Sequence, residues 1–230
     1  MNRESLIAAV KVKIDEVSPF DNVHGNNTTQ DFIAADSDTD YDEVNPVENY
    51  IKDCLDKAAE YCLNILPLSL LSEDVDYDTY TAHINKKGVG IIDGIDKYVR
   101  FVRLVELDGV WERDVRVFIT TSDPMYALQQ KLFTRGGVSK PVVAYNPEQQ
   151  TLELYSFPKE LCPVDGFDHA HAHTELYYIK CNIAAEKVKS NISDYIVLKC
   201  AAMVEDILGE SQTAQILMNE FTNKLAPILK

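Results

Sequence analysis

The C-terminal segment of this chain constrains its fold most strongly, because it is patterned as two consecutive helices. Residues 193–204 are apolar almost all round, which predicts a helix that is buried on several sides. The stretch after residue 211 is apolar only at three- and four-residue spacing, which predicts a helix with one apolar face. That face carries Ala214, Leu217, Met218, Phe221, Leu225 and Ile228.

The two helices are predicted to meet at a short break over residues 208–211. Gly209 suits the end of the first helix, and Ser211 is predicted to cap the start of the second. Neither helix carries a group placed for chemistry, so the pair predicts packing and docking. We therefore treat part of the apolar stripe as a hypothetical interface, formed by Leu217, Phe221, Leu225 and Ile228.

Two further helices are expected nearer the N-terminus. Apolar residues recur on one side of residues 4–17, and Pro19 stops this helix. A second helix is predicted over 46–66, opened by Pro46 and ended by Pro67. The predicted organisation is an N-terminal helix over 1–18, an acidic loop or arm over 19–45, and a main domain over 46–230.

The centre of the chain, residues 80–181, is predicted to be rich in β-structure. Alternating apolar and polar residues predict a strand over 98–105, and the turn residues that follow it predict an antiparallel partner over 110–119. A hairpin is expected from 140–145 and 151–157, and a last strand over 175–181. With helices over 46–66 and 190–229 on either side, the predicted fold class is α+β: a helical bundle from the N- and C-terminal helices with an inserted antiparallel β-region.

Composition narrows the range of partners. The chain has 230 residues and a formal net charge of −15, which is the wrong sign for gripping nucleic acid by its phosphates. It has no stretch of the roughly 20 apolar residues that cross a bilayer, and its N-terminus lacks the apolar run of a signal peptide. Its 5 cysteines are odd in number and irregularly spaced, which predicts reduced thiols and synthesis in the cytoplasm.

The sharpest candidate for chemistry is a histidine cluster at His169, His171 and His173. On an extended strand these side chains and that of Glu175 would point to one side, and they could bind a divalent cation such as Zn²⁺. Alternate side chains on a straight strand are about 6.6 Å apart, so closing three of them on one ion requires a bend. The competing interpretation is an exposed polar or interface loop, and we predict neither a metal nor another cofactor.

Other patterns resemble functional motifs but lack their decisive residues. The acidic runs that begin at Asp36 and Asp74 start like EF-hand loops, yet they lack the glycine at position six and the glutamate at position twelve. The glycine-containing segment 134–140 lacks phosphate-loop spacing and is predicted to be a connecting loop. Cys162 has no oriented partner, so no catalytic residue is predicted. Trp111 is either an anchor of the β-region or an interface hot spot, and the sequence does not separate the two.

The C-terminal pattern nevertheless resembles a known family, the head–tail adaptor or ring proteins of tailed phages (tail tubular protein A, or gatekeeper, and head-completion proteins). The stretches 98–111 and 136–158 are similar to a strand with a downstream tryptophan and to a later hairpin of that family. Glu210 stands where the family often has Asp, Ala226 comes earlier than in the family pattern, and the 92–96 segment departs from the usual Leu-Pro motif. The composition resembles that of ring proteins of crAss-like short-tailed phages. The residues that carry the C-terminal resemblance are Leu208, Gly209, Glu210, Ala214, Gln215, Leu217, Glu220, Phe221, Leu225 and Ala226.

The resemblance implies a structural virion protein without enzymatic activity. Such proteins assemble, typically as twelve copies, into a ring below the portal protein that connects capsid to tail and contacts further tail or ring proteins. DNA passes through the ring without tight binding, and an acidic surface suits that role. Two alternatives stay open: a metal-dependent enzyme centred on the histidine cluster, and a binding module that uses an acidic arm over residues 20–43.

Overall fold

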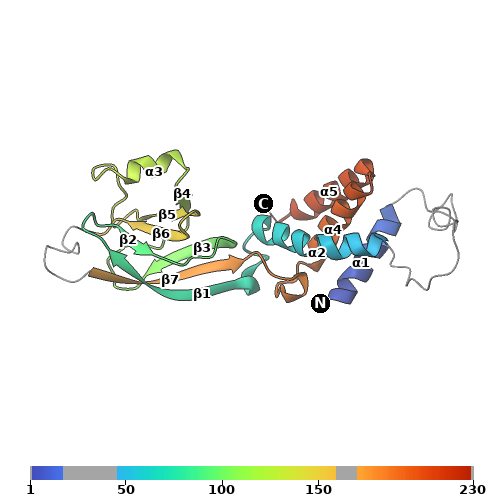
Figure 1. Ribbon diagram of the computed structural model, residues 1–230, viewed down its shortest axis with the longest axis horizontal. Helices are drawn as coiled ribbons and strands as arrows, with labels where there is room; N and C mark the ends of the chain where they lie inside the picture. The colour runs from blue at the N-terminus through green and yellow to red at the C-terminus, as the bar shows by residue number, and fades with distance from the viewer. Residues whose placement is uncertain (1, 18–45, 159–169, 229–230) are drawn as a thin grey trace, which may run out of the picture. The chain divides into compact units, whose positions relative to one another are not determined.

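The computed structural model describes residues 2–17, 46–158 and 170–228, which fall into two compact units (Figure 1). The first, called the helical unit, combines described residues from Met1–Asp74 and Cys181–Lys230. The second, called the β-unit, is Val75–Lys180. The predicted arm over 19–45, the EF-hand-like run at Asp36 and Cys162 lie outside the described residues.

Among the described residues, four helices build the helical unit, with α4 at its centre. α4 packs against the other three, which explains why its sequence is apolar almost all round. Its buried side chains include Tyr195, Val197 and Leu198, while α1 buries Leu6 and Val10 from one side only. The helices are α1 (Arg3–Val17), α2 (Pro46–Ile65), α4 (Ser193–Ile207) and α5 (Ser211–Leu225), with short 3₁₀ turns at η1 (Ser72–Asp74) and η3 (Ala185–Lys187).

The turn between α4 and α5 depends on a glycine. Gly209 has a φ of +88°, a conformation that side chains other than glycine adopt at a cost. The predicted cap at Ser211 is wrong by one position. Ser211 is already the first helical residue, and Glu210 precedes it without a capping side-chain hydrogen bond.

The β-unit contains a seven-stranded mixed sheet, as far as the described residues show, in the order β3-β7-β1-β2-β6-β5-β4 (Figure 1). The β4–β5 pair is parallel and every other pair is antiparallel. The short helix α3 (Pro124–Gln129) lies in the crossover that a parallel pair requires. The strands are β1 (Val75–Ile84), β2 (Gly90–Ile92), β3 (Val99–Glu106), β4 (Phe118–Thr120), β5 (Val142–Asn146), β6 (Thr151–Tyr155) and β7 (Ala170–Lys180).

The predicted fold class, a helical bundle with an inserted antiparallel β-region, is wrong. The sheet is mixed, and it curls until it is nearly closed and barrel-like. The rings of Phe101 on edge strand β3 and Phe118 on edge strand β4 stack with centroids 4.8 Å apart. The β-unit also has its own hydrophobic core, which includes Leu104, Leu152 and Leu176. It is therefore a compact unit in its own right and not an insertion that depends on a helical bundle.

Strand pairing was predicted correctly for one hairpin and wrongly for another. β5 and β6 pair as expected, from Val142 opposite Tyr155 to Asn146 opposite Thr151. The expected hairpin between 98–105 and 110–119 reduces to one bridge, between Leu104 and Val115. β3 pairs with β7 instead, and β7 lies between β3 and β1 and is hydrogen-bonded to both.

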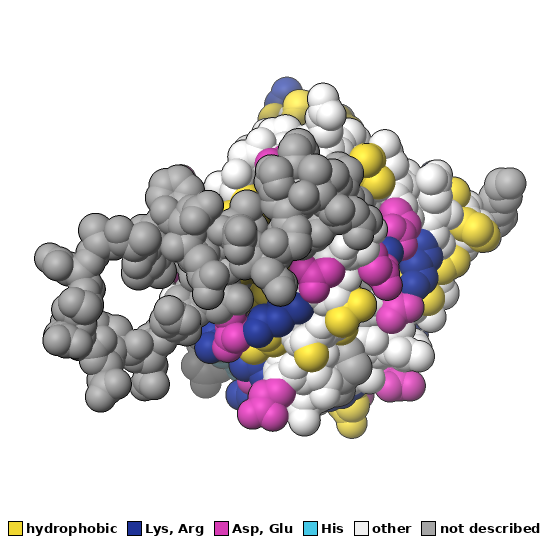
Figure 2. Space-filling model, turned by 90° about the vertical axis from the view of Figure 1, so that its right-hand side faces the viewer, with side chains coloured by type: hydrophobic (Ala, Val, Ile, Leu, Met, Phe, Trp, Pro, Cys, Tyr) yellow, Lys and Arg dark blue, Asp and Glu magenta, His cyan; other side chains and the backbone are white. Residues whose placement is uncertain are grey.

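The described surface mixes charges of both signs. On the face shown in Figure 2, acidic and basic side chains lie among one another, and hydrophobic side chains are scattered over it. Of the helices in the described ranges, none is both long and apolar enough to cross a bilayer.

Candidate functional site

The apolar stripe of α5 is used largely within the helical unit. Leu217 and Phe221 are buried, and the Phe221 ring packs edge-on against Tyr61 and Tyr195 at centroid distances of 6.1 and 5.5 Å. Leu225 is half-buried and Ile228 is exposed. The first two residues of the hypothetical interface therefore offer no surface to another protein in this conformation.

Trp111 is likewise a core residue of the β-unit. Its ring packs against Phe157 with centroids 5.4 Å apart, and its peptide N–H donates to the carboxylate of Glu106 at 3.2 Å. Glu106 also accepts the N–H groups of Asp108 and Val110, so one buried carboxylate fixes the whole turn. Of the two interpretations, the structure favours the anchor.

The histidine cluster lies partly outside the described residues. His169 is not described, whereas His171 and His173 are exposed on β7, which begins at Ala170, so the loop expected there is wrong from that residue on. His171 faces His83 across the β1–β7 pair, with ring centroids 4.9 Å apart. Within the described ranges, no three histidine, cysteine or acidic side chains are grouped to hold a metal ion.

His173 is held by a carboxylate. Its peptide N–H donates to Asp108 at 2.8 Å, and its ring Nδ1 lies 3.1 Å from the other carboxylate oxygen. The backbone hydrogen bond lowers the pKa of Asp108, because it favours the ionised carboxylate. This contact fastens the turn after β3 to β7 and needs no metal.

A different feature of the β-unit was not predicted: an exposed apolar loop. We call residues 124–135, which comprise α3 and the turn after it, the tip loop. Phe133 is 99% exposed and Leu132 is 72% exposed. Met125 and Leu128 of the same loop are also exposed. Large apolar side chains gathered in one exposed place are typical of a surface that binds another molecule.

The tip loop is held in shape by hydrogen bonds. Asp123 caps α3 by accepting the peptide N–H of Met125 at 2.7 Å. The hydroxyl of Thr134 donates to the carbonyl of Leu128 at 2.6 Å, and the buried Gln129 side chain accepts the N–H of Gly136 at 2.9 Å. Phe133 therefore projects from a fixed turn.

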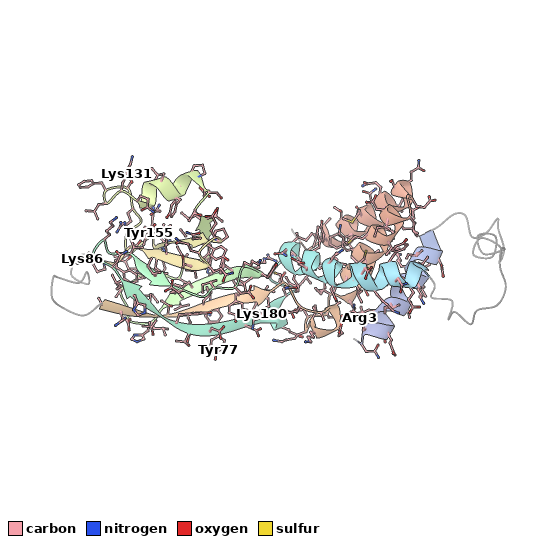
Figure 3. The ribbon with its side chains drawn as sticks, viewed as in Figure 1. Arg3, Tyr77, Lys86, Lys131, Tyr155 and Lys180 are labelled. Atoms are coloured by element: carbon pink, nitrogen blue, oxygen red, sulfur yellow. The ribbon has the colours of Figure 1, made fainter. Side chains whose placement is uncertain are left out.

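Beside the tip loop lies a basic pocket of about 450 Å³. Its cationic side chains are Lys86, Lys87 and Arg135, and none of the described residues that line it is acidic. Figure 3 shows Lys86, Lys131 and Tyr155 at the same end of the β-unit. The remaining wall of what we call the basic pocket is made by Gln130, Leu132, Gly136, Gly137, Val138, Ser156, Phe157 and Pro158.

A network of phenols and a carboxylate supports this pocket. Gln130 donates to the Tyr155 hydroxyl at 2.6 Å, and the hydroxyls of Tyr155 and Tyr126 both donate to Glu153. Burial and the neighbouring Glu153 raise the pKa values of both tyrosines, so both stay protonated donors at neutral pH. The Arg135 guanidinium lies 5.3 Å from the centre of the Tyr155 ring.

Ser156 is the strained residue of the pocket. Its φ is +92°, and for a residue other than glycine such a conformation costs on the order of 1–3 kcal/mol. Ser156 is only 4% exposed, and its hydroxyl has no hydrogen-bond partner among the described residues. Gly136 permits this arrangement, because a Cβ there would lie 2.6 Å from the Lys140 carbonyl oxygen and 3.0 Å from the Ser156 hydroxyl.

The sequence did hold a signal for this region. In a chain of net charge −15, residues 124–147 contain three basic residues and no acidic one. The comparison of segment 134–140 with phosphate-binding loops considers only the spacing of its glycines and does not detect this excess of basic residues. Lys86 and Lys87 lie far from it in sequence, and the β2–β6 and β5–β6 pairings together bring the two segments side by side.

Comparison of the sequence with models of known protein families and with curated proteins gives no match.

Proposed function

We propose that this chain is a structural virion protein without enzymatic activity, an adaptor ring protein in the neck of a tailed phage. The observation that carries the proposal is the tip loop. The Phe133 ring is 99% exposed on a hydrogen-bonded turn, and exposing so much apolar surface to water is unfavourable. Burying the ring against another protein surface would remove that cost. The sequence resemblance supplies the kind of assembly.

The proposed contact is a heterologous one between neighbouring copies, which closes into a ring when the rotation between copies allows it. Full burial of one leucine and one phenylalanine stabilises a contact by about 3–6 kcal/mol in total. Repeated at every subunit, this modest gain gives a lasting assembly. The docking role first assigned to the α5 stripe thus passes to Leu132 and Phe133, because Leu217 and Phe221 are already buried.

The charge of the chain supports the proposed passage of DNA. A net charge of −15 repels the phosphate backbone at long range, which suits a ring through which DNA moves without tight binding. The portal protein and further tail or ring proteins are the proposed neighbours, and the neck of the virion is the proposed location.

Mass photometry and negative-stain imaging of the purified chain, alone and with the portal, test this proposal. We expect rings for the wild type and monomers for the double variant Leu132→Ser/Phe133→Ser, with equal melting temperatures. Val117→Ser, which changes another exposed apolar residue of the β-unit, is the matched control and should assemble normally. A wild-type protein that stays monomeric even with the portal would overturn the proposal.

A further inference from the structure

We propose that the groove between α4 and α5 of one copy receives the tip loop of the neighbouring copy. This inference deepens the proposed function and rests on it, because it names the surface that covers Phe133 in the ring. A ring contact is heterologous, so one chain must carry two different surfaces that fit each other. The tip loop of the β-unit is the first of these surfaces, and the α4–α5 groove of the helical unit is the second.

The α4–α5 groove has a volume of about 290 Å³ and is lined by both apolar and polar residues. Its alanines, Ala202 and Ala214, are buried, while Met203 and Met218 from the same two helices are half-buried. Alanine leaves room between two helices, and methionine is flexible and polarisable, so its sulfur makes favourable contacts with aromatic rings. The apolar part of the groove therefore suits the side chain of Phe133.

Exposed apolar residues continue from the groove to the end of α4. Ile207 and Leu208 directly follow Asp206, which lines the groove, and both are exposed. Exposed apolar side chains gathered beside a groove are typical of a surface that binds another protein. They give Leu132 of the tip loop an apolar partner next to the groove that takes Phe133.

The two surfaces carry opposite charges. Lys131 is exposed directly before Leu132, and the tip loop contains two basic residues and no acidic one. Asp206 is exposed and lines the groove, and within the described ranges neither Lys131 nor Asp206 forms an ion pair. Lys199 also lines the groove, but it is engaged within its own unit, since its ammonium lies 4.1 Å from the centre of the Tyr61 ring. Lys131 of one copy and Asp206 of the next therefore attract each other.

These charges favour the head-to-tail contact over a symmetric one. In a two-fold contact the same surface of both copies meets, so Lys131 and Arg135 of one tip loop would face those of the other. Like charges brought together in this way oppose association, whereas Lys131 against Asp206 favours it. The occupant of the α4–α5 groove is thus the tip loop of a second copy of this chain.

Two full-length variants that each keep one surface test the contact. The tip variant, Leu132→Ser/Phe133→Ser, keeps the groove, and the groove variant, Met203→Lys, keeps the tip loop. Each alone should be monomeric and fully folded by circular dichroism, whereas their mixture can form one contact and should give a heterodimer and nothing larger. NMR of the isotope-labelled tip variant, titrated with the groove variant, should show saturable shifts centred on the groove, with a Kd on the order of 0.1–1 mM.

Charge reversals at exposed positions test the pairing of Lys131 with Asp206. Lys131→Asp in the groove variant should weaken the heterodimer about fivefold, and Asp206→Lys in the tip variant should do the same. The two reversals combined should restore binding to within about twofold of the unreversed pair.

Two control variants match these changes and should leave binding unchanged. Lys97→Asp makes the same change of charge at an exposed lysine of the β-unit outside the tip loop. Ile216→Ser removes an exposed apolar side chain of α5 that does not line the groove. A loss of binding in either control equal to that in the test variants would overturn the assignment of the groove.

The outcomes separate this inference from the ring itself. If the wild type forms rings but the two variants form no heterodimer at concentrations above the expected Kd, the groove assignment is overturned and the ring stands. Shifts that lie away from the groove, or a double reversal that fails to restore binding, would overturn the assignment as well. A heterodimer together with a wild type that forms no ring would support the contact and overturn the ring, and absence of both would overturn both.

Discussion

The carboxylate of Asp74 accepts the peptide N–H of Ser190 at 3.0 Å, across 116 residues of sequence. Its other oxygen accepts the N–H of Lys189 at 2.8 Å. Asp74 ends η1, directly before the β-unit begins, and Ser190 lies three residues before α4. One buried side chain therefore ties the place where the chain leaves the helical unit to the segment that leads into α4.

Asp74→Ala should destabilise the helical unit by about 1–3 kcal/mol, because the buried N–H of Ser190 and the N–H of Lys189 lose their acceptor. Urea unfolding followed by circular dichroism measures the change. Glu73→Ala, at an exposed neighbouring acidic residue, is the matched control and should change stability by less than about 0.5 kcal/mol. Equal stability of the two variants would show that the Asp74 contacts contribute little.

The sequence predicted local elements better than their pairing. The 3.6-residue pattern located α4 and α5, and the polar turn after Asn146 located the β5–β6 hairpin, because both signals are carried by neighbouring residues. The turn at Gly109 is also present, with a φ of +75°. It leads to one bridge only, because β7, some 70 residues later, takes the position beside β3. Nothing local to 98–119 records that competition.

The candidate site could not be predicted from local sequence patterns for a similar reason. Apolar spacing identified Leu217 and Phe221 as members of a face, but it could not say whether the face meets the same chain or another one. In the sequence, Ser156 is an ordinary residue after a strand, and no neighbouring residue indicates its positive φ or its closeness to Gly136. The basic pocket needs the 86–87 and 130–138 segments side by side, which requires the sheet topology.

Phe221→Ala should destabilise the helical unit by about 3–5 kcal/mol, since it removes a buried ring and leaves a cavity between Tyr61 and Tyr195. Ile228→Ala, at the exposed end of the same stripe, is the control and should have little effect on unfolding. If Phe221→Ala instead leaves stability unchanged and abolishes assembly, the original interface hypothesis for the stripe is correct.

The link between α1 and α2 should weaken in acid. Hydrogen bonds from Lys11 and Lys52 lower the pKa of Glu48 to about 2, from an ordinary value of 4.5. Because the folded state holds this proton less tightly than the unfolded state, the contribution is complete above about pH 5 and is lost as the pH falls toward 2. Glu48→Gln should therefore lower the melting temperature at pH 7, and the difference should shrink steadily toward pH 2.

Metal analysis tests the histidine hypothesis directly. We expect less than 0.1 equivalent of zinc, manganese or iron per chain, because His173 contacts Asp108 and His171 faces a single further histidine. The melting temperature should be the same with and without a chelator. One equivalent of metal that is lost in the triple variant His169→Ala/His171→Ala/His173→Ala would support the metal-dependent enzyme.

The four described cysteines should resist thiol reagents in the folded protein. All four are buried, and burial raises the pKa of Cys62 and of Cys200 to about 12. At pH 8 the thiolate, which is the reactive form, is then on the order of one part in 10⁴ at these two sites. In a Cys162→Ser background we expect no rapid reaction with Ellman's reagent at pH 8, and 4 equivalents after unfolding in guanidinium, which is the 5 cysteines of the chain less the one replaced. Fast reaction of the α2 or α4 thiols in the native protein would mean that the packing between these helices opens readily. If the thiols are protected from the reagent in the wild type but react in Phe221→Ala, the opening involves the core around Phe221.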